Sequence, residues 1–312
     1  MSEPNATAHE QRALKYSVWG NLSLGVLGIV FAALCHSDAV LLDGVFSLIN
    51  FGVALLSLKV ARMVMRPTDD RYPFGYAYYE PILNLGKGLI IATVCLLGLY
   101  SSAGALFHGG REIAAGIAFF YAISASGIGL FITLTLRAFA KKCHSPIVDV
   151  DAKNWLLDTV LSGIIAVALL GVYLLENSRF RDWAPYADPV AVMVLCLIFM
   201  PVPIRIIREN WAQVLGQNVD AKLLKDAREA MANYLADKSC ESHQVRAIRA
   251  GRFVYLHVFL IVAKDATWPS SVEEQDACRR AICEQLKPTY PYLVIDVMFT
   301  HDKVWADQDL LS

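Results

Sequence analysis

Long apolar stretches separated by short polar connections fill the first two thirds of the chain. A helix needs about 20 mostly apolar residues to cross the ~30 Å hydrocarbon core of a bilayer. Six stretches reach that length, at residues 16–35, 39–58, 82–107, 113–136, 155–175 and 189–207. The pattern predicts six transmembrane helices, and this even number places both termini on the same side of the membrane.

Residues 216–312 have the hydrophobic pattern of a small water-soluble domain. A first helix is indicated by apolar residues at helical spacing, namely Leu223, Leu224, Ala227, Met231, Tyr234 and Leu235. Strand-like runs at 244–250 and 253–262 precede a helix at 271–287 and a strand at 292–299. The predicted architecture is a polar tail (1–15), a six-helix all-α membrane domain (16–215) and an α+β domain (216–312) of order αββαβ, with its helices on one face of the sheet.

Basic residues decide the orientation in the membrane. The connections after spans two and four and the start of the tail carry Lys59, Arg62, Arg66, Arg71, Arg137, Lys141, Lys142, Lys153, Arg205 and Arg208. The other three connections hold only Arg111, Arg179 and Arg181. By the positive-inside rule both termini are predicted to be cytoplasmic. The short chain without a long His-rich loop favours a prokaryotic plasma (inner) membrane.

Composition narrows the function classes. Hydrophobic residues make up 56% of the chain and mean hydropathy is +0.43, which is typical of a membrane protein. The net charge is −1, which argues against a nucleic-acid-binding protein, because such proteins normally carry a basic stripe or domain. The sequence contains no GxSxG, HExxH, P-loop or dinucleotide-binding motif. We therefore expect neither an enzyme nor a resident cofactor, and any transport must draw on an ion gradient.

Three ionisable residues lie inside predicted spans: Asp43, Lys87 and Asp158. A charge at the centre of a transmembrane helix costs about 2.5–3.5 kcal/mol on the insertion scale and usually marks a pathway. Lys87 either extends its stem toward the cytoplasm or pairs with Asp158 or Asp43. In the second case its ammonium competes with a bound cation or carries protons.

Polar oxygens accompany these charges on two spans. Asp43 and Asn50 lie along one face of the second span, and Asn154 and Asp158 are four residues apart in the fifth. Two such stripes facing each other could coordinate a dehydrated cation. Alternatively, the asparagines only hydrogen-bond neighbouring helices, as polar side chains in membrane bundles often do. Four tryptophans near predicted span ends are interpreted as interfacial anchors: Trp19, Trp155, Trp183 and Trp211.

The chain resembles the cation diffusion facilitator (CDF) family. The resemblance lies in the six spans, the aspartate in span two, "NxxxD" in span five, the αββαβ domain and the loop "RPTDDRYPFGYAYYEP", which is similar to the family's P-x-D-D-x-x-x-FGHG-x-x-E. It implies a homodimer that exchanges a divalent metal for protons by alternating access. It also implies a metallochaperone-like cytoplasmic domain.

Several family metal positions are substituted in this chain. Zinc exporters of the family carry His or Asp ligands in spans two and five, where this chain has Phe46, Asn50, Asn154 and Asp158. Zinc prefers His, Cys and carboxylate ligands, whereas neutral amide oxygens suit a harder cation such as Mn²⁺ or Mg²⁺. The predicted transport site therefore contains Asp158, Asn154, Asn50 and, as a supporting carboxylate, Asp43.

The family's other metal sites are also altered. Tyr72 and Tyr76 replace loop histidines of zinc-type members, so a loop site is not expected. The resemblance places His243, His257 and Asp302 near positions that bind metal in the cytoplasmic domain of some members. Lone histidines on strands are more often structural or solvent-facing, and this alternative stays open.

The main hypothesis is a secondary transporter that exports a divalent metal in exchange for protons. Asp158 would be the charged ligand and proton-exchanging group, and Lys87 an internal charge that tunes or replaces the cation. One alternative is a CDF-fold transporter of a different small cation, or a proton pathway, with Lys87 in place of the metal. Another is a membrane-anchored sensor acting through its cytoplasmic domain. The expected partners are a second copy of the chain, the bilayer, metal cations and protons.

Overall fold

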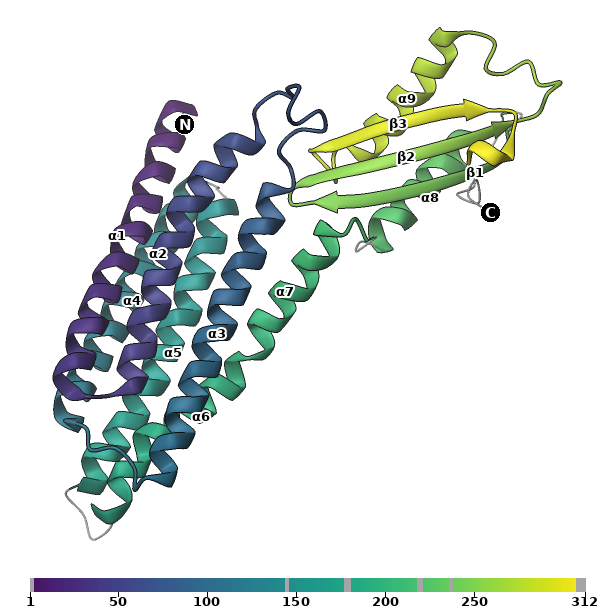
Figure 1. Ribbon diagram of the computed structural model, residues 1–312. Coiled ribbons are helices and arrows are strands. Elements are labelled where there is room, and N and C mark those ends of the chain that lie inside the picture. Colours follow the sequence, from purple (N-terminus) through teal and green to yellow (C-terminus); the bar gives the residue numbers. More distant parts are fainter. Residues whose placement is uncertain are drawn as a thin grey trace. The chain divides into compact units, whose positions relative to one another are not determined.

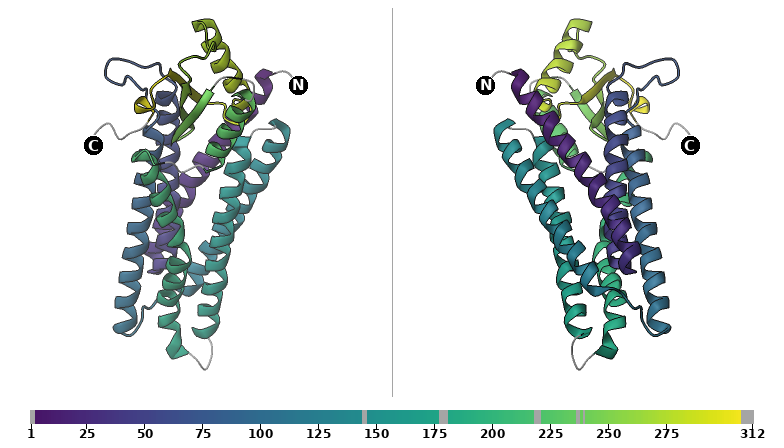
Figure 2. Two further views of the ribbon diagram at one scale, coloured as in Figure 1. Left: turned by 90° about the vertical axis from the view of Figure 1, so that its right-hand side faces the viewer. Right: turned by 90° about the vertical axis from the view of Figure 1, so that its left-hand side faces the viewer.

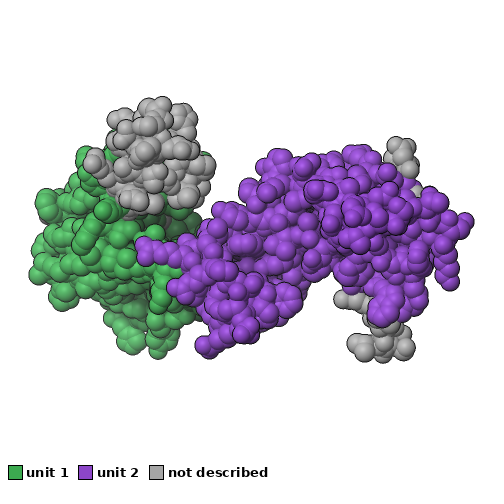
Figure 3. Space-filling model, turned by 90° about the horizontal axis from the view of Figure 1, so that it is seen from above, with its two compact units in different colours: residues 1–59, 86–205 green, residues 60–85, 206–312 purple. Residues whose placement is uncertain are grey.

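The computed structural model describes residues 3–143, 146–176, 181–217, 221–235, 238 and 240–306. The chain divides into two compact units (Figure 3). One consists of Met1–Lys59 and Gly86–Arg205, and the other of Val60–Leu85 and Ile206–Ser312. The second unit thus combines the loop after the second long helix with the C-terminal region. Each unit is described by itself.

Six helical stretches among the described residues are long and apolar enough to cross a membrane. Five are single helices, namely α1 (Glu3–Cys35), α2 (Asp38–Val64), α3 (Tyr79–Phe107), α4 (Ala115–Cys143) and α5 (Pro146–Glu176). The sixth is formed by the 3₁₀ turn η1 (Arg181–Trp183), α6 (Ala184–Phe199) and α7 (Pro201–Val214) (Figure 1). It is interrupted at Met200, directly before Pro201, where proline removes a backbone donor. The prediction of six apolar helices is confirmed.

Glycines allow helices of the first unit to approach closely. A Cβ added at Gly28 of α1 would lie 2.4 Å from the Cα of Gly44 on α2, and one added at Gly129 of α4 would lie 2.6 Å from Oγ1 of Thr159 on α5. Small residues permit such contacts because they let two helix backbones meet. Helices α1, α4 and α5 run side by side (Figures 1 and 2). These crossings bring the polar faces of α2 and α5 together.

The C-terminal region forms a three-stranded sheet with two helices. Strand β2 (Phe253–Val262) lies in the centre, antiparallel to β1 (Cys240–Ala250) and parallel to β3 (Leu293–Thr300). Helices α8 (Ala221–Leu235) and α9 (Val272–Leu286) pack on the sheet, and η2 (Lys303–Trp305) follows β3. Their buried core includes Leu223, Met231, Leu256, Leu260 and Ile282. The predicted order αββαβ is confirmed.

The tip of the β1–β2 hairpin contacts Glu80 at the start of α3, within the second unit. Gly251 has φ +59°, as the two-residue turn requires, and a Cβ at this position would lie 2.2 Å from Oε2 of Glu80. The Arg252 backbone N–H donates to Oε2 of Glu80 at 2.8 Å, and its guanidinium forms an ion pair with Oε1. The Glu80 carboxylate also raises the pKa of Arg252.

Candidate functional site

A cavity of about 30 Å³ lies among α1, α2, α4 and α5. A water molecule needs roughly 10–15 Å³ of such space, so the cavity has room for a water or a small ion. Its polar lining consists of Asn21, Asp43, Ser47, Asn50, Asp158, Thr159 and Ser162. Two carboxylates and several neutral oxygens therefore surround one small space at the depth of the bilayer.

The cavity joins the predicted oxygen residues of α2 and α5. The Nδ2 of Asn50 donates to Oδ2 of Asp158 across 3.4 Å. This is a long hydrogen bond, so it holds the amide weakly in place. Asp43 and Asp158 also interact electrostatically. The structure thus brings together three of the four predicted site residues.

Asn154, the fourth, lies outside the cavity. It is exposed, whereas Trp155 beside it is buried and lines the cavity wall. Asn154 and Asp158 share a helix face, but Asn154 lies one turn before Asp158, about 6 Å along the helix axis, and it is not among the residues that line the cavity. The structure therefore gives Asn154 no place in the cavity.

Asp43 is held by two hydroxyl groups that the sequence interpretation missed. Its Oδ2 accepts a hydrogen bond from Tyr121 of α4 at 2.8 Å, and its Oδ1 accepts one from Ser162 of α5 at 3.0 Å. Ser162 continues the four-residue spacing of Asn154 and Asp158, which was a usable signal. Tyr121 gave none, because a single tyrosine in a span is ordinary. The hydroxyls fix Asp43 in the bundle, so it combines a structural role with a place in the cavity wall.

Lys87 of α3 interacts electrostatically with Asp158. Within the described part of the chain it forms no ion pair within 4.0 Å and no hydrogen bond through its side chain. Lys87 therefore acts on Asp158 through its field and not as a direct partner. Phe46, at a family ligand position, lines the cavity, and its ring centroid is 6.5 Å from that of Phe199.

Trp155 corrects one prediction from the sequence. It is not an interfacial anchor, because only 2% of its surface is exposed and its Nε1–H donates to Oγ of Ser17 at 2.8 Å. Ser17 of α1 is also hydrogen-bonded to Asp151 of α5. The Oδ2 of Asp151 is buried and has no hydrogen-bond partner among the residues that the structure describes. A carboxylate oxygen with spare acceptor capacity therefore lies one helical turn before the cavity wall.

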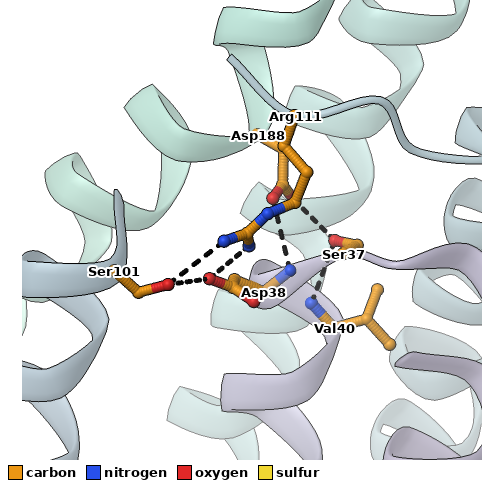
Figure 4. A network of polar contacts seen from close by, with 6 residues as sticks. All are labelled: Ser37, Asp38, Val40, Ser101, Arg111 and Asp188. Carbon is orange, nitrogen blue, oxygen red and sulfur yellow. Dashed lines mark hydrogen bonds and ion pairs between the residues drawn. The ribbon is translucent and has the colours of Figure 1, made fainter. Parts of the chain in front are cut away.

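At the opposite end of the first unit, a polar network ties α2, α3 and α6 to the connection after α3 (Figure 4). Ser37 donates to Oδ1 of the fully buried Asp188 at 2.6 Å, and the Asp38 N–H donates to Oδ2 at 3.2 Å. Ser101 donates to Oδ2 of Asp38 at 2.8 Å, and Arg111 forms an ion pair with the same oxygen. The acids are thus satisfied by protein groups at this end of the bundle.

The loop between α2 and α3 is organised by tyrosines instead of histidines. The Asp69 side chain accepts hydrogen bonds from the Tyr76 hydroxyl and, at 2.7 Å, from the Tyr72 backbone N–H, which lower the pKa of this carboxyl. The ring centroids of Tyr72 and Tyr76 lie 4.5 Å apart. Asp69 is thus satisfied by its own loop.

The three candidate metal ligands of the C-terminal domain do not converge. His243 pairs with Leu260, and His257 is three residues from Leu260 on the same strand, so the two histidines point to opposite faces of the sheet. His257 Nδ1 is 3.5 Å from Oδ2 of Asp296, and Asp302 caps η2 through the Val304 N–H. Across the residues that the structure describes, no three His, Cys, Asp or Glu side chains are grouped to hold a metal ion.

Comparison with known proteins finds similarity over most of the chain. Residues 14–215 match the family described as Cation efflux transmembrane domain. Manganese efflux system protein MneP of Bacillus subtilis is 24% identical over 249 residues, covering 79% of this chain and 82% of that protein. Metal tolerance protein 2 of Oryza sativa subsp. japonica is 27% identical over 282 residues (81% and 69%). Magnetosome protein MamB of Paramagnetospirillum magneticum is 24% identical over 268 residues (84% of each).

Proposed function

Because the chain belongs to the cation efflux (CDF) family of membrane transporters, we propose that it exports a hard divalent cation in exchange for protons through the cavity lined by Asp43, Asn50 and Asp158. The observation that carries this proposal is the pair of carboxylates and neutral oxygens around one ion-sized space. Carboxylate and amide oxygens replace the water shell of Mn²⁺ or Mg²⁺ better than that of zinc. The similarity to a manganese efflux protein supports the same choice.

Charge balance links the cation to protons in this proposal. One divalent cation neutralises two ionised carboxylates, and like charges left behind in a buried site disfavour their ionised forms. Protons therefore replace the cation when it leaves, with Asp158 as the exchanging group. Asn50 now donates to Asp158, so its amide must rotate to offer its oxygen to a cation.

Flux in proteoliposomes tests the site. We expect Mn²⁺ uptake driven by a pH gradient, reduced by about tenfold or more in Asp158→Asn, since the neutral amide neither balances the cation nor releases a proton. Asn154→Ala is the matched control, because Asn154 lies outside the cavity, and it should keep most of the flux. Equal loss in both variants, or undiminished flux in Asp158→Asn, would remove the proposed site.

The electrostatic interaction between the Lys87 ammonium and the Asp158 carboxylate favours a second candidate function. In this alternative the ammonium takes the place of the metal, and the protein moves protons or another small cation. Lys87→Gln separates the two. Under the main proposal the variant binds Mn²⁺ at least as tightly as the wild type, because a repelling charge is gone. Loss of proton flux with no gain in Mn²⁺ binding would favour the alternative.

Orientation and assembly also belong to the proposal. The basic connections support cytoplasmic termini, and family membership supports a homodimer. Protease access to the C-terminal domain in inside-out and right-side-out vesicles tests the first. The mass of the detergent-solubilised protein tests the second. Cleavage only in right-side-out vesicles, or a monomer at working concentration, would contradict these two statements.

A further inference from the structure

A second cavity of about 30 Å³ lies beside the first and shares Asp43 and Phe46 with it. Its distinctive lining residues are Cys95 of α3 and Cys196 of α6. Both cysteines are almost completely buried, with 0% and 2% of their surface exposed, and both line this one cavity. The transport proposal assigns neither cysteine a role.

Gly98 makes room for the pair. It follows Cys95 by three residues, so both face the same side of α3. A Cβ added at Gly98 would lie 3.2 Å from Sγ of Cys196. The sulfur of Cys196 is therefore seated against the surface of α3 formed by Cys95 and Gly98. Two thiols from different helices therefore border the same small space.

We propose that Cys95 and Cys196 form a binding site for a soft divalent cation that accepts two thiolate ligands, of the chemical class of Hg²⁺. Thiolates select soft metals, whereas the neighbouring oxygen cavity suits hard ones. Binding breaks two S–H bonds, forms two metal–sulfur bonds and releases two protons to water. The bound unit is electrically neutral. Apart from Asp43, the walls are apolar, and a neutral unit avoids the cost of burying net charge there.

Competition with a monothiol tests this site on the full-length reduced protein. One equivalent of Hg²⁺ is added with excess glutathione, and the alkylation rate of each cysteine in the folded protein, with and without the metal, is followed by mass spectrometry. We expect Cys95 and Cys196 to be protected together, because two ligands on one site outcompete single thiols. In Cys95→Ser, protection of Cys196 should fall by about tenfold or more, as for any lone thiol.

Matched variants separate the possible outcomes. Cys35→Ser removes another buried thiol outside this cavity and should leave protection unchanged, as should Asp158→Asn, which disables the proposed transport site. Cys95→Ala is a second variant, and its melting temperature is measured. If it equals that of the wild type, a loss of protection is not caused by misfolding. Protection of Cys196 that persists in folded Cys95→Ala, no protection in the wild type, or a disulfide in place of the metal complex would overturn the proposal.

Discussion

The two carboxylates that line the cavity of the first unit, Asp43 and Asp158, differ in their hydrogen-bond partners. Among the residues that the structure describes, Asp43 accepts hydrogen bonds from two hydroxyls, whereas Asp158 accepts one long hydrogen bond from Asn50. A carboxylate that is fully hydrogen-bonded is poorly available to an ion, and a loosely bonded one is available. This difference is the reason for assigning cation and proton exchange to Asp158, with Asp43 in support.

The hydroxyls on Asp43 give a stability prediction. Tyr121→Phe leaves Oδ2 of Asp43 without its donor in the bundle, which costs about 1–3 kcal/mol for a buried polar group. We expect a lower melting temperature in detergent. Tyr100→Phe, at an 82% exposed tyrosine on α3, is the control and should change little. An unchanged melting temperature in Tyr121→Phe would show that Asp43 does not depend on this hydrogen bond.

Two cysteines of α9 should differ in reactivity. Burial raises the pKa of Cys278 to about 11, so only about one thiol in a thousand is ionised at pH 8. Cys283 is half-buried on the same helix. Maleimide labelling followed by mass spectrometry should modify Cys283 readily and Cys278 slowly, with Cys278 accelerating as the pH rises toward 10. Equal rates at pH 8 would contradict the buried position of Cys278.

At the scale of elements, the crossing of α1 and α2 depends on two glycines. Gly28→Ala puts a methyl group 2.4 Å from the Cα of Gly44, and overpacking of this kind costs about 1–3 kcal/mol. We expect a lower melting temperature and reduced transport, because α2 carries Asp43 and Asn50. Gly52→Ala on α2, with nothing within 4 Å of its new methyl group, should be neutral. Equal behaviour of the two variants would mean that the helices separate freely.

At the scale of the whole molecule, the second unit joins residues that are distant in sequence. Gln213 in the last turn of α7 accepts a hydrogen bond from the Gly251 N–H at 3.0 Å, and the Tyr255 hydroxyl donates to the Phe74 carbonyl at 3.2 Å. Together with Glu80 and Arg252 they connect the loop and the start of α3 to the hairpin. Within the second unit, the hairpin is therefore connected to the α2–α3 loop, the start of α3 and the end of α7 by specific polar contacts.

This fastening can be measured through Glu80. Glu80→Gln removes the ion pair with Arg252. The side chain of Arg252 is 34% exposed and that of Glu80 is 16% exposed, so solvent screens the pair and the loss of stability should be roughly 1 kcal/mol or less. We expect faster amide exchange at the hairpin tip. Glu229→Gln breaks the exposed pair with Lys225 and is the control. Unchanged exchange at residues 250–253 would show that Glu80 does not hold the hairpin.

Much of the architecture was already determined by the sequence alone. The spans could be located because the bilayer imposes a length and an apolar composition on each helix, and both are local properties of the chain. The αββαβ order followed from residue periodicity in the same way. The unusual cost of charge in a span also singled out Asp43, Lys87 and Asp158.

Only the tertiary structure decided which faces of the helices meet. Lipid makes a transmembrane helix apolar nearly all round, so its sequence carries little signal about its rotation. For this reason the sequence could not exclude Asn154 from the cavity, bury Trp155, or give Asp43 its partner Tyr121. The shared cavity of Cys95 and Cys196 depends in the same way on how α3 and α6 pack, which no local pattern in either helix specifies.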